Sequence, residues 1–276
     1  MHSRELKARP KPDLRELLRH WRAVRGRSQQ EVGLEAGVSQ RHLSFIESGR
    51  ATPSRVTLLA VAEALDVPLG ERNQLLLAAG YAPLYSEATW NETEMRSIMA
   101  AVGRMLSQQE PYPAVLMDRH WNVLAANDAS PRFFGKFIDL HALQARTGRR
   151  NLLHLMFDPA GMRPFIHDWE KVSRSLLQRV RREAVGHVLD VATQELLDAL
   201  HAYPGVPREP AAQMDGAAAD LPMIPLSFVR DGVVLRYFSM VTTVGTPRTI
   251  AAQELRVECL FPADELTDAN HLAFMG

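Results

Sequence analysis

The side chains best placed for chemistry stand between Ser39 and Arg50. Gln40, Arg41 and His42 occupy the first turn of a predicted helix, because the residue before them is a good N-cap. A helix that only packs would carry apolar residues there, whereas Arg suits the O6 and N7 atoms of guanine and Gln suits N6 and N7 of adenine. The pattern therefore predicts that Gln40, Arg41 and His42 read DNA bases.

Five neighbouring positions complete the predicted DNA-contacting set. Ser44 and Phe45 continue the outward face of the helix, and Phe45 either touches a thymine methyl group or covers the domain surface. Ser39, Gln29 at the start of the preceding helix, and Arg50 beyond the reading helix are expected at phosphates, as are the arginines of the N-terminal stretch. Phosphate contacts fix position without specifying sequence.

Five short helices must position these residues, and they predict an all-α helix-turn-helix domain over residues 1–83. Capping boxes at Asp13 with Glu16 and at Ser28 with Glu31 start the first two helices. Gly37 ends the second helix and the third begins three residues later, the arrangement in which the second helix of the pair lies in the major groove. An αα-hairpin used for protein contact is the alternative, but it would favour apolar or mixed residues at positions 40 and 41.

Apolar periodicity predicts which faces of these helices are buried. We expect the second helix to bury Val32, Leu34 and Ala36. The fourth helix begins near Thr52-Pro53-Ser54, and its predicted buried stripe consists of Val56, Leu59, Ala60 and Leu65.

Charge and composition narrow the class of protein. The formal net charge is zero, but residues 4–27 carry nine Lys and Arg side chains against three acidic ones, which favours a polyanionic partner. No apolar run approaches the roughly 20 residues of a membrane span, and the N-terminus lacks a signal-peptide core. The single cysteine, Cys259, agrees with a reducing compartment, so we expect a cytoplasmic protein without a membrane partner.

Beyond residue 83 the pattern changes from all-helical to mixed. A helix from Thr89 to Gln109 predicts a linking segment over residues 84–110. Residues 111–276 read as an α+β domain with a mostly antiparallel sheet, whose predicted strands are 114–117, 121–125, 224–230, 233–244 and 254–261. Helices are expected at 151–157, 165–180 and 186–202, and residues 204–222 read as a mobile loop without chemistry.

Signatures of catalysis and metal binding are missing from the sequence. It contains no GxSxG, HExxH, phosphate-loop or paired-cysteine motif, so we predict neither an enzyme nor a metal site. His167 and Glu170 share a helix face and read as a solvated or structural pair. Cys259 reads as a small buried residue rather than a redox sensor. An enzyme with an accessory helical domain and a protein-contact adaptor remain the competing classes.

Aromatic and methionine residues in the second domain are the reason to expect a cavity, although most of them should belong to the core. Ligand pockets are mainly apolar with a few polar anchors. The candidate polar anchors are Asn127, Arg163 and His167, with Asn127 also suited to capping a helix. The candidate apolar lining residues are Met117, Trp121, Phe133, Phe134, Phe157, Trp169 and Phe238.

Several motifs resemble known families. The stretch SQQEVGLEAGVSQRHLSFIESGRATPS is similar to the xenobiotic-response-element (lambda-repressor-like) helix-turn-helix family, except that Gly33 stands where the family usually has Ala and Phe45 where it is commonly polar. The motifs ERNQLLLAAGYAP, DRHWNVLAAN, NLLHLMFDPAGMRPFIHDWE and FPADE resemble MmyB-like transcription regulators with a PAS-like C-terminal domain.

The resemblance implies a sequence-specific, DNA-binding transcriptional regulator that acts as a homodimer. Two reading helices about 34–36 Å apart would require a near-palindromic operator. It also implies that the second domain holds a small apolar, fatty-acid-like ligand, with no other cofactor. The alternative is a regulator that does not sense a ligand, whose C-terminal domain only dimerises or binds a protein partner.

Overall fold

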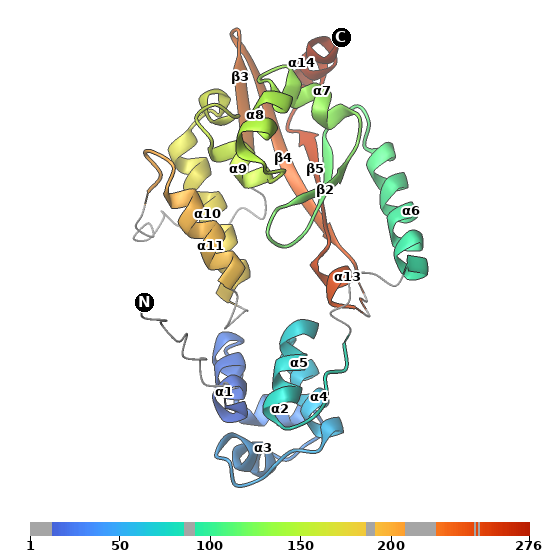
Figure 1. The fold of residues 1–276 in the computed structure, drawn as a ribbon, viewed down its shortest axis with the longest axis vertical. Coiled ribbons are helices and arrows are strands. Elements are labelled where there is room, and N and C mark those ends of the chain that lie inside the picture. Colours follow the sequence, from blue (N-terminus) through green and yellow to red (C-terminus); the bar gives the residue numbers. More distant parts are fainter. Residues whose placement is uncertain (1–12, 86–91, 186–190, 208–224, 246, 248) are drawn as a thin grey trace, which may run out of the picture. The chain divides into compact units, whose positions relative to one another are not determined.

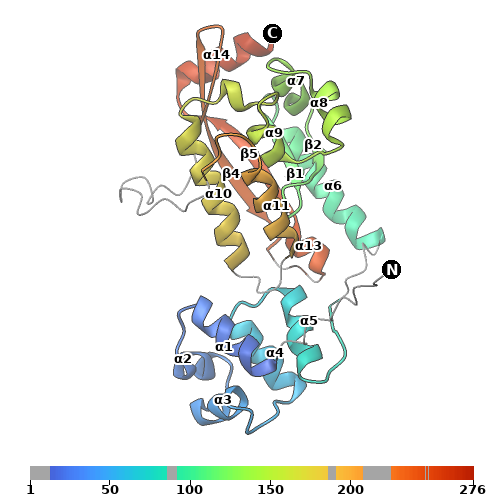
Figure 2. The same cartoon turned by 60° about the vertical axis from the view of Figure 1, so that its left-hand side comes forward.

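The computed structural model describes residues 13–85, 92–185, 191–207 and 225–276, apart from positions 246 and 248. The described residues divide into two compact units (Figures 1 and 2). The first is the predicted five-helix domain, made of α1 (Leu14–Val24), α2 (Gln29–Glu35), α3 (Gln40–Glu47), α4 (Arg55–Ala64) and α5 (Leu69–Ala78).

Capping side chains set the helix starts in this unit. Ser28 and Glu31 form the predicted reciprocal capping box, and the Ser39 and Ser54 side chains each accept a hydrogen bond from the N–H three residues later. Asp13 caps α1 by accepting from the Arg15 N–H. Trp21, Val32, Leu43 and other apolar side chains of these helices then form one core.

The buried faces of two short helices differ from the prediction. Leu34 is 85% exposed and Val56 is 79% exposed, whereas Leu58 and Val61 are buried on α4. In α4, apolar residues stand at adjacent positions, so the helical period is compatible with more than one buried face. Packing against the other helices determines which face is buried.

The second unit is built on a five-stranded antiparallel sheet of order β2-β1-β5-β4-β3. The strands are β1 (Ala114–Met117), β2 (Val123–Ala126), β3 (Pro225–Arg230), β4 (Val233–Thr243) and β5 (Arg256–Pro262). Asp231 and Gly232 both have positive φ between β3 and β4, as a type I′ hairpin requires. The α+β class and the antiparallel sheet expected of the PAS-like domain are thus confirmed.

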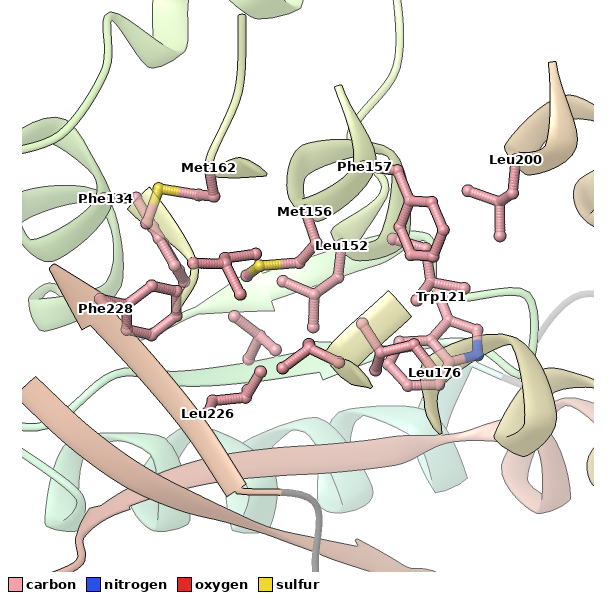
Figure 3. Packing of buried hydrophobic residues seen from close by; sticks show 14 of the residues in the cluster. Trp121, Phe134, Leu152, Met156, Phe157, Met162, Leu176, Leu200, Leu226 and Phe228 are labelled. Carbon is pink, nitrogen blue, oxygen red and sulfur yellow. The ribbon is translucent and has the colours of Figure 1, made fainter. Parts of the chain in front are cut away.

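Helices cover this sheet on both faces. The face that carries Val115, Phe228 and Leu260 packs against most of the helices and holds the large core seen in Figure 3. The helices that contribute to this core are α7 (Ala129–Gly135), α9 (Leu152–Phe157), α10 (Trp169–Val185) and α11 (Val191–His201). The opposite face, with Ala114 and Leu116, packs against α6 (Glu92–Gln108).

Some elements depart from the predicted set. The helix predicted from residue 165 begins at Trp169, after the short 3-10 helix η1 (Arg163–Phe165). Most of the predicted loop at 204–222 lies outside the described residues, as do residues 186–190 of a predicted helix. Among the helices that the structure describes, three were not predicted, namely α8 (Leu140–Thr147), α13 (Ile250–Glu254) and α14 (Glu265–Met275).

Candidate DNA interface and ligand cavity

The turn between α2 and α3 is tight because small residues line it. Gly37 has a φ of +68°, the left-handed conformation that favours glycine at a helix end. A Cβ atom added to Gly33 would lie 2.8 Å from the backbone oxygen of Val38. Only a very small residue therefore fits at position 33, and the turn brings the start of α3 close to α2.

The predicted reading residues share the outward side of α3. Gln40 and Arg41 are exposed, while His42, Ser44 and Phe45 are half-buried. Leu43 and Ile46, on the opposite side of the helix, are buried in the core. The first turn of α3 therefore presents a guanidinium group and an amide away from the domain, as base reading requires.

The residues predicted at phosphates flank this surface. The Ser39 hydroxyl accepts a hydrogen bond from the His42 N–H at 3.1 Å and keeps its own proton for another acceptor. Arg50 is exposed just after α3. Gln29 is more engaged, because its amide nitrogen donates to Glu47 Oε2 at 2.7 Å.

Glu47 is a functional neighbour that the sequence analysis missed. This carboxylate is only 4% exposed and receives two hydrogen bonds from Arg22 of α1 as well as that from Gln29. The Arg22 pKa is raised, chiefly by its hydrogen bond with Glu47. A signal was available, since a glutamate at a helix C-terminus opposes the helix dipole unless a cation compensates it.

Several N-terminal arginines have partners within the domain. Arg25 donates to the backbone oxygens of Leu65 and Asp66, and Arg27 donates to Glu35 at 2.6 Å. These hydrogen bonds hold the guanidinium groups against the helices. The predicted phosphate contacts by the N-terminal arginines accordingly have less support than the one by Arg50.

A cavity of about 340 Å³ opens in the second unit beside the sheet. Val115 and Val123 come from the strands, Phe134 from α7 and Leu152 from α9. The outer wall includes Leu140, Leu143, Gln144 and Thr147 of α8. No residue of α8 is buried, although Leu140 packs against the edge of the large core, so Leu140 and Leu143 border the cavity as half-buried side chains.

Polar groups gather at one part of the cavity wall. Arg149 Nη1 lies 2.8 Å from His154 Nε2, and His154 Nδ1 lies 2.9 Å from the Tyr203 hydroxyl. Burial, and secondarily the Arg149 charge, lowers the pKa of His154 to about 4. The imidazole is therefore neutral near pH 7, and because a guanidinium only donates, the His154 proton sits on Nδ1.

A second, smaller cavity of about 30 Å³ lies next to the first. Val115, Phe134 and Leu152 line both spaces. The smaller one reaches Met156, Leu226 and Leu260 in the large core. Glu258 is the charged residue of the smaller lining, and together the two cavities outline a mainly apolar route from the polar wall toward the interior.

Phe134 is the one predicted ligand residue that lines the larger cavity. Met117, Trp121, Phe133 and Phe157 are buried in the core, where Figure 3 shows Trp121 and Phe157 among packed side chains. Their predicted ligand contacts therefore have no support from the cavity and stay predictions.

The polar candidates and the other two aromatic ones also lie elsewhere. Asn127 stands just before Asp128, the N-cap of α7, and its side-chain oxygen accepts hydrogen bonds from the Ala114 N–H and from the Ser130 N–H in the first turn of α7. Arg163 lies over the Trp169 ring at 5.0 Å. Of the remaining candidates, His167 is exposed beside Asp168 and Phe238 stacks on Phe261.

Other chemistry has little support among the described residues. They contain no group of three or more His, Cys, Asp or Glu side chains that could hold a metal ion. Cys259 is buried, and burial raises the pKa of its thiol. None of the described helices is long and apolar enough to cross a membrane.

The fold and the two sites define a class: a helix-turn-helix unit joined in one chain to an α+β unit with its own cavity. Residues 18–72 match the helix-turn-helix family model. Residues 98–273, more than half of the chain, match the family model described as the MmyB-like transcription regulator ligand binding domain. The protein belongs to this MmyB-like family.

A curated relative and a solved structure illustrate what the chain is similar to. An uncharacterized HTH-type transcriptional regulator, y4dJ, from Sinorhizobium fredii (strain NBRC 101917 / NGR234), is 44% identical over 46 residues, which is 17% of this chain and 60% of that protein. The structure of an RNA-binding light-oxygen-voltage receptor aligns over 94% of this chain and 61% of its own, with 10% identity and a TM-score of 0.28. A TM-score this low establishes no shared fold.

Proposed function

We propose that the protein is a sequence-specific DNA-binding transcriptional regulator that responds to a small amphiphilic ligand. The exposed first turn of α3 carries the DNA-binding part of the proposal. There Gln40, Arg41 and His42 read bases in the major groove, while Gln29, Ser39 and Arg50 hold phosphates. A homodimer presents two such helices to a near-palindromic operator.

The DNA proposal is tested with a duplex that the full-length protein itself selects from a random library. Each good bidentate base contact discriminates by about 1–3 kcal/mol, so Arg41→Ala should weaken binding of that duplex about fivefold to 150-fold and relax its sequence preference. Lys136→Ala removes an exposed cation from the other unit and serves as the matched control. Equal affinity of the Arg41→Ala and wild-type proteins would reject the assignment.

The shape and lining of the cavity support the proposal of a fatty-acid-like ligand. Its inner wall is apolar, and the adjoining smaller cavity extends it into the core, which suits an elongated tail. Arg149 and Arg150 in the polar part of the lining suit an anionic head, because Asp158, the acidic residue of this lining, is already paired with Arg146 at 2.8 Å.

Strand β1 offers a path by which the ligand changes DNA binding. Val115 lines the cavity, while its neighbours Ala114 and Leu116 point to the opposite face and pack with Leu106 of α6. A ligand that displaces β1 would therefore also displace α6. Such a ligand alters DNA affinity only if it binds two arrangements of the protein unequally.

Native mass spectrometry of the purified protein, with solvent extraction of anything released, tests the ligand proposal. Binding of saturated fatty acids is then compared with that of alcohols of equal chain length, using wild-type and Arg149→Gln proteins. We expect the acids to bind more tightly and Arg149→Gln to remove the difference. If neither series binds, the result favours the alternative function, in which the C-terminal domain only dimerises or binds a protein partner.

A further inference from the structure

Phe45 contacts two arginines of the candidate DNA interface. The guanidinium carbon of Arg41 lies 5.3 Å from the centre of the Phe45 ring, and that of Arg50 lies 5.9 Å from it. Both distances are within the range of a cation–π interaction. One half-buried ring therefore contacts both a predicted base-reading side chain and a predicted phosphate-binding side chain.

The backbone at the end of α3 fixes one of these partners. Gly49, with φ of +77°, follows the C-cap, and its N–H donates to the Ile46 oxygen at 3.0 Å. The Arg50 N–H donates to the Phe45 oxygen at 2.8 Å. These two hydrogen bonds form a Schellman motif, in which the side chains at the positions of Phe45 and Arg50 often contact each other. Arg41 reaches the ring from one helical turn earlier.

The two arginines differ from their neighbours in the same unit. Arg22, Arg25 and Arg27 all donate hydrogen bonds to carboxylates or backbone oxygens. Among the described residues, the contacts of the Arg41 and Arg50 guanidinium groups are those with the ring of Phe45. Their hydrogen-bond donors therefore remain available to an outside acceptor, while the ring restricts where those donors point.

We infer that Phe45 is a positioning residue that holds Arg41 and Arg50 as one prearranged pair for DNA. This inference rests on the proposed DNA-binding function. Immobilising a flexible side chain on binding costs conformational entropy. A contact that already restricts the side chain in the free protein reduces this cost. It also explains an aromatic residue on this outward face without a direct contact to a thymine methyl group.

The test compares Phe45→Leu, which keeps apolar volume, with Phe45→Tyr, which keeps the aromatic face. With the duplex selected by the wild-type protein, we expect Phe45→Leu to weaken binding about fivefold to fiftyfold and Phe45→Tyr to stay within about twofold. Thermal unfolding of each variant checks that the domain remains folded, and Phe45→Met replaces Phe45→Leu if it does not.

A mutant cycle separates positioning from direct contact. In an Arg41→Ala/Arg50→Ala background, measured at low salt so that weak complexes remain detectable, Phe45→Leu should change affinity by less than about twofold. A loss that persists in this background would show that Phe45 itself touches DNA and would overturn the inference. Wild-type affinity of Phe45→Leu would overturn it as well.

Failure of this inference is distinguishable from failure of the proposed function. If Arg41→Ala and Arg50→Ala weaken binding but Phe45→Leu does not, the two arginines bind DNA without help from the ring. If neither arginine substitution weakens binding, both the DNA assignment and the inference are rejected.

Discussion

Arg22 of α1 and Glu47 of α3, 25 residues apart in the sequence, are joined by two hydrogen bonds of 2.8 and 3.1 Å. Gln29 of α2 donates to the same carboxylate. Three helices of the DNA-binding unit therefore meet at one nearly buried charge, directly behind the outward face of α3.

Replacing Glu47 should destabilise this unit. Glu47→Ala leaves the Arg22 guanidinium, which is 25% exposed, with the Arg27 backbone oxygen as its remaining acceptor, and losing the hydrogen bonds to the carboxylate should cost about 1–3 kcal/mol of unfolding free energy. Glu63→Ala, on the exposed side of α4, should change it by less than about 0.5 kcal/mol. Urea unfolding of the full-length protein, followed by circular dichroism, measures both. A Glu47→Ala protein as stable as wild type would show that the pair contributes nothing net.

Acidification should destabilise the second unit through two buried histidines. Burial lowers the pKa of His271, and the pKa of His154 is about 4. His271 is 0% exposed and its Nε2 donates to the Pro111 oxygen, so Nδ1 accepts from the Tyr237 hydroxyl at 2.6 Å. Protonation of His271 at Nδ1 would remove that acceptor.

Stability falls with falling pH because the unfolded state binds more protons than the folded state in this range. An unfolded histidine has a pKa of about 6.5, so below this pH the unfolded chain takes up protons that the folded one does not. Stability is thus complete above about pH 6.5 and declines as pH falls toward 4. Melting temperatures between neutral pH and about pH 5 measure the decline. His154→Gln should make this decline in melting temperature shallower.

The sequence predicted the exposed first turn of α3 better than it predicted the cavity lining. Gln40 and Arg41 lie within twelve residues of their caps and turn, so local rules of helix start and stop fix their placement. The cavity instead gathers Val115, Phe134 and Leu152 from separate elements, and aromatic content cannot tell which side chains border empty space. Trp121 and Phe157 pack in the core for the same reason that made them candidates, their large apolar area.

Two misses have a more specific physical origin. Helix α8 has no buried residue, so the sequence lacks the clear apolar stripe that identifies other helices. The position of Glu47 at a helix C-terminus indicates a need for a cation, but its partner Arg22 is distant in the sequence and spacing rules detect only neighbours within a helix.

Filling the cavity should abolish ligand binding without unfolding the protein. Leu143→Trp places a larger side chain from α8 into the space, and the melting temperature of the ligand-free protein should change little because Leu143 is only half-buried. Ala145→Trp, on an exposed position of α8 outside the cavity lining, is the matched control. Extraction and mass spectrometry of ligand from both variants decide the result. Equal ligand recovery would place the binding site elsewhere.

The packing of Leu106 of α6 against β1 should matter for coupling more than for ligand binding. Leu106→Val removes apolar contact on the face of β1 opposite to Val115, so the ligand still meets the same lining. We expect ligand affinity to stay within about twofold, while the ligand-induced change in DNA affinity shrinks by about 0.5–2 kcal/mol. DNA binding titrated with and without saturating ligand measures this change. A full ligand effect in Leu106→Val would mean that the signal leaves the cavity by another route, for which α8, on the opposite wall, is the next element to test.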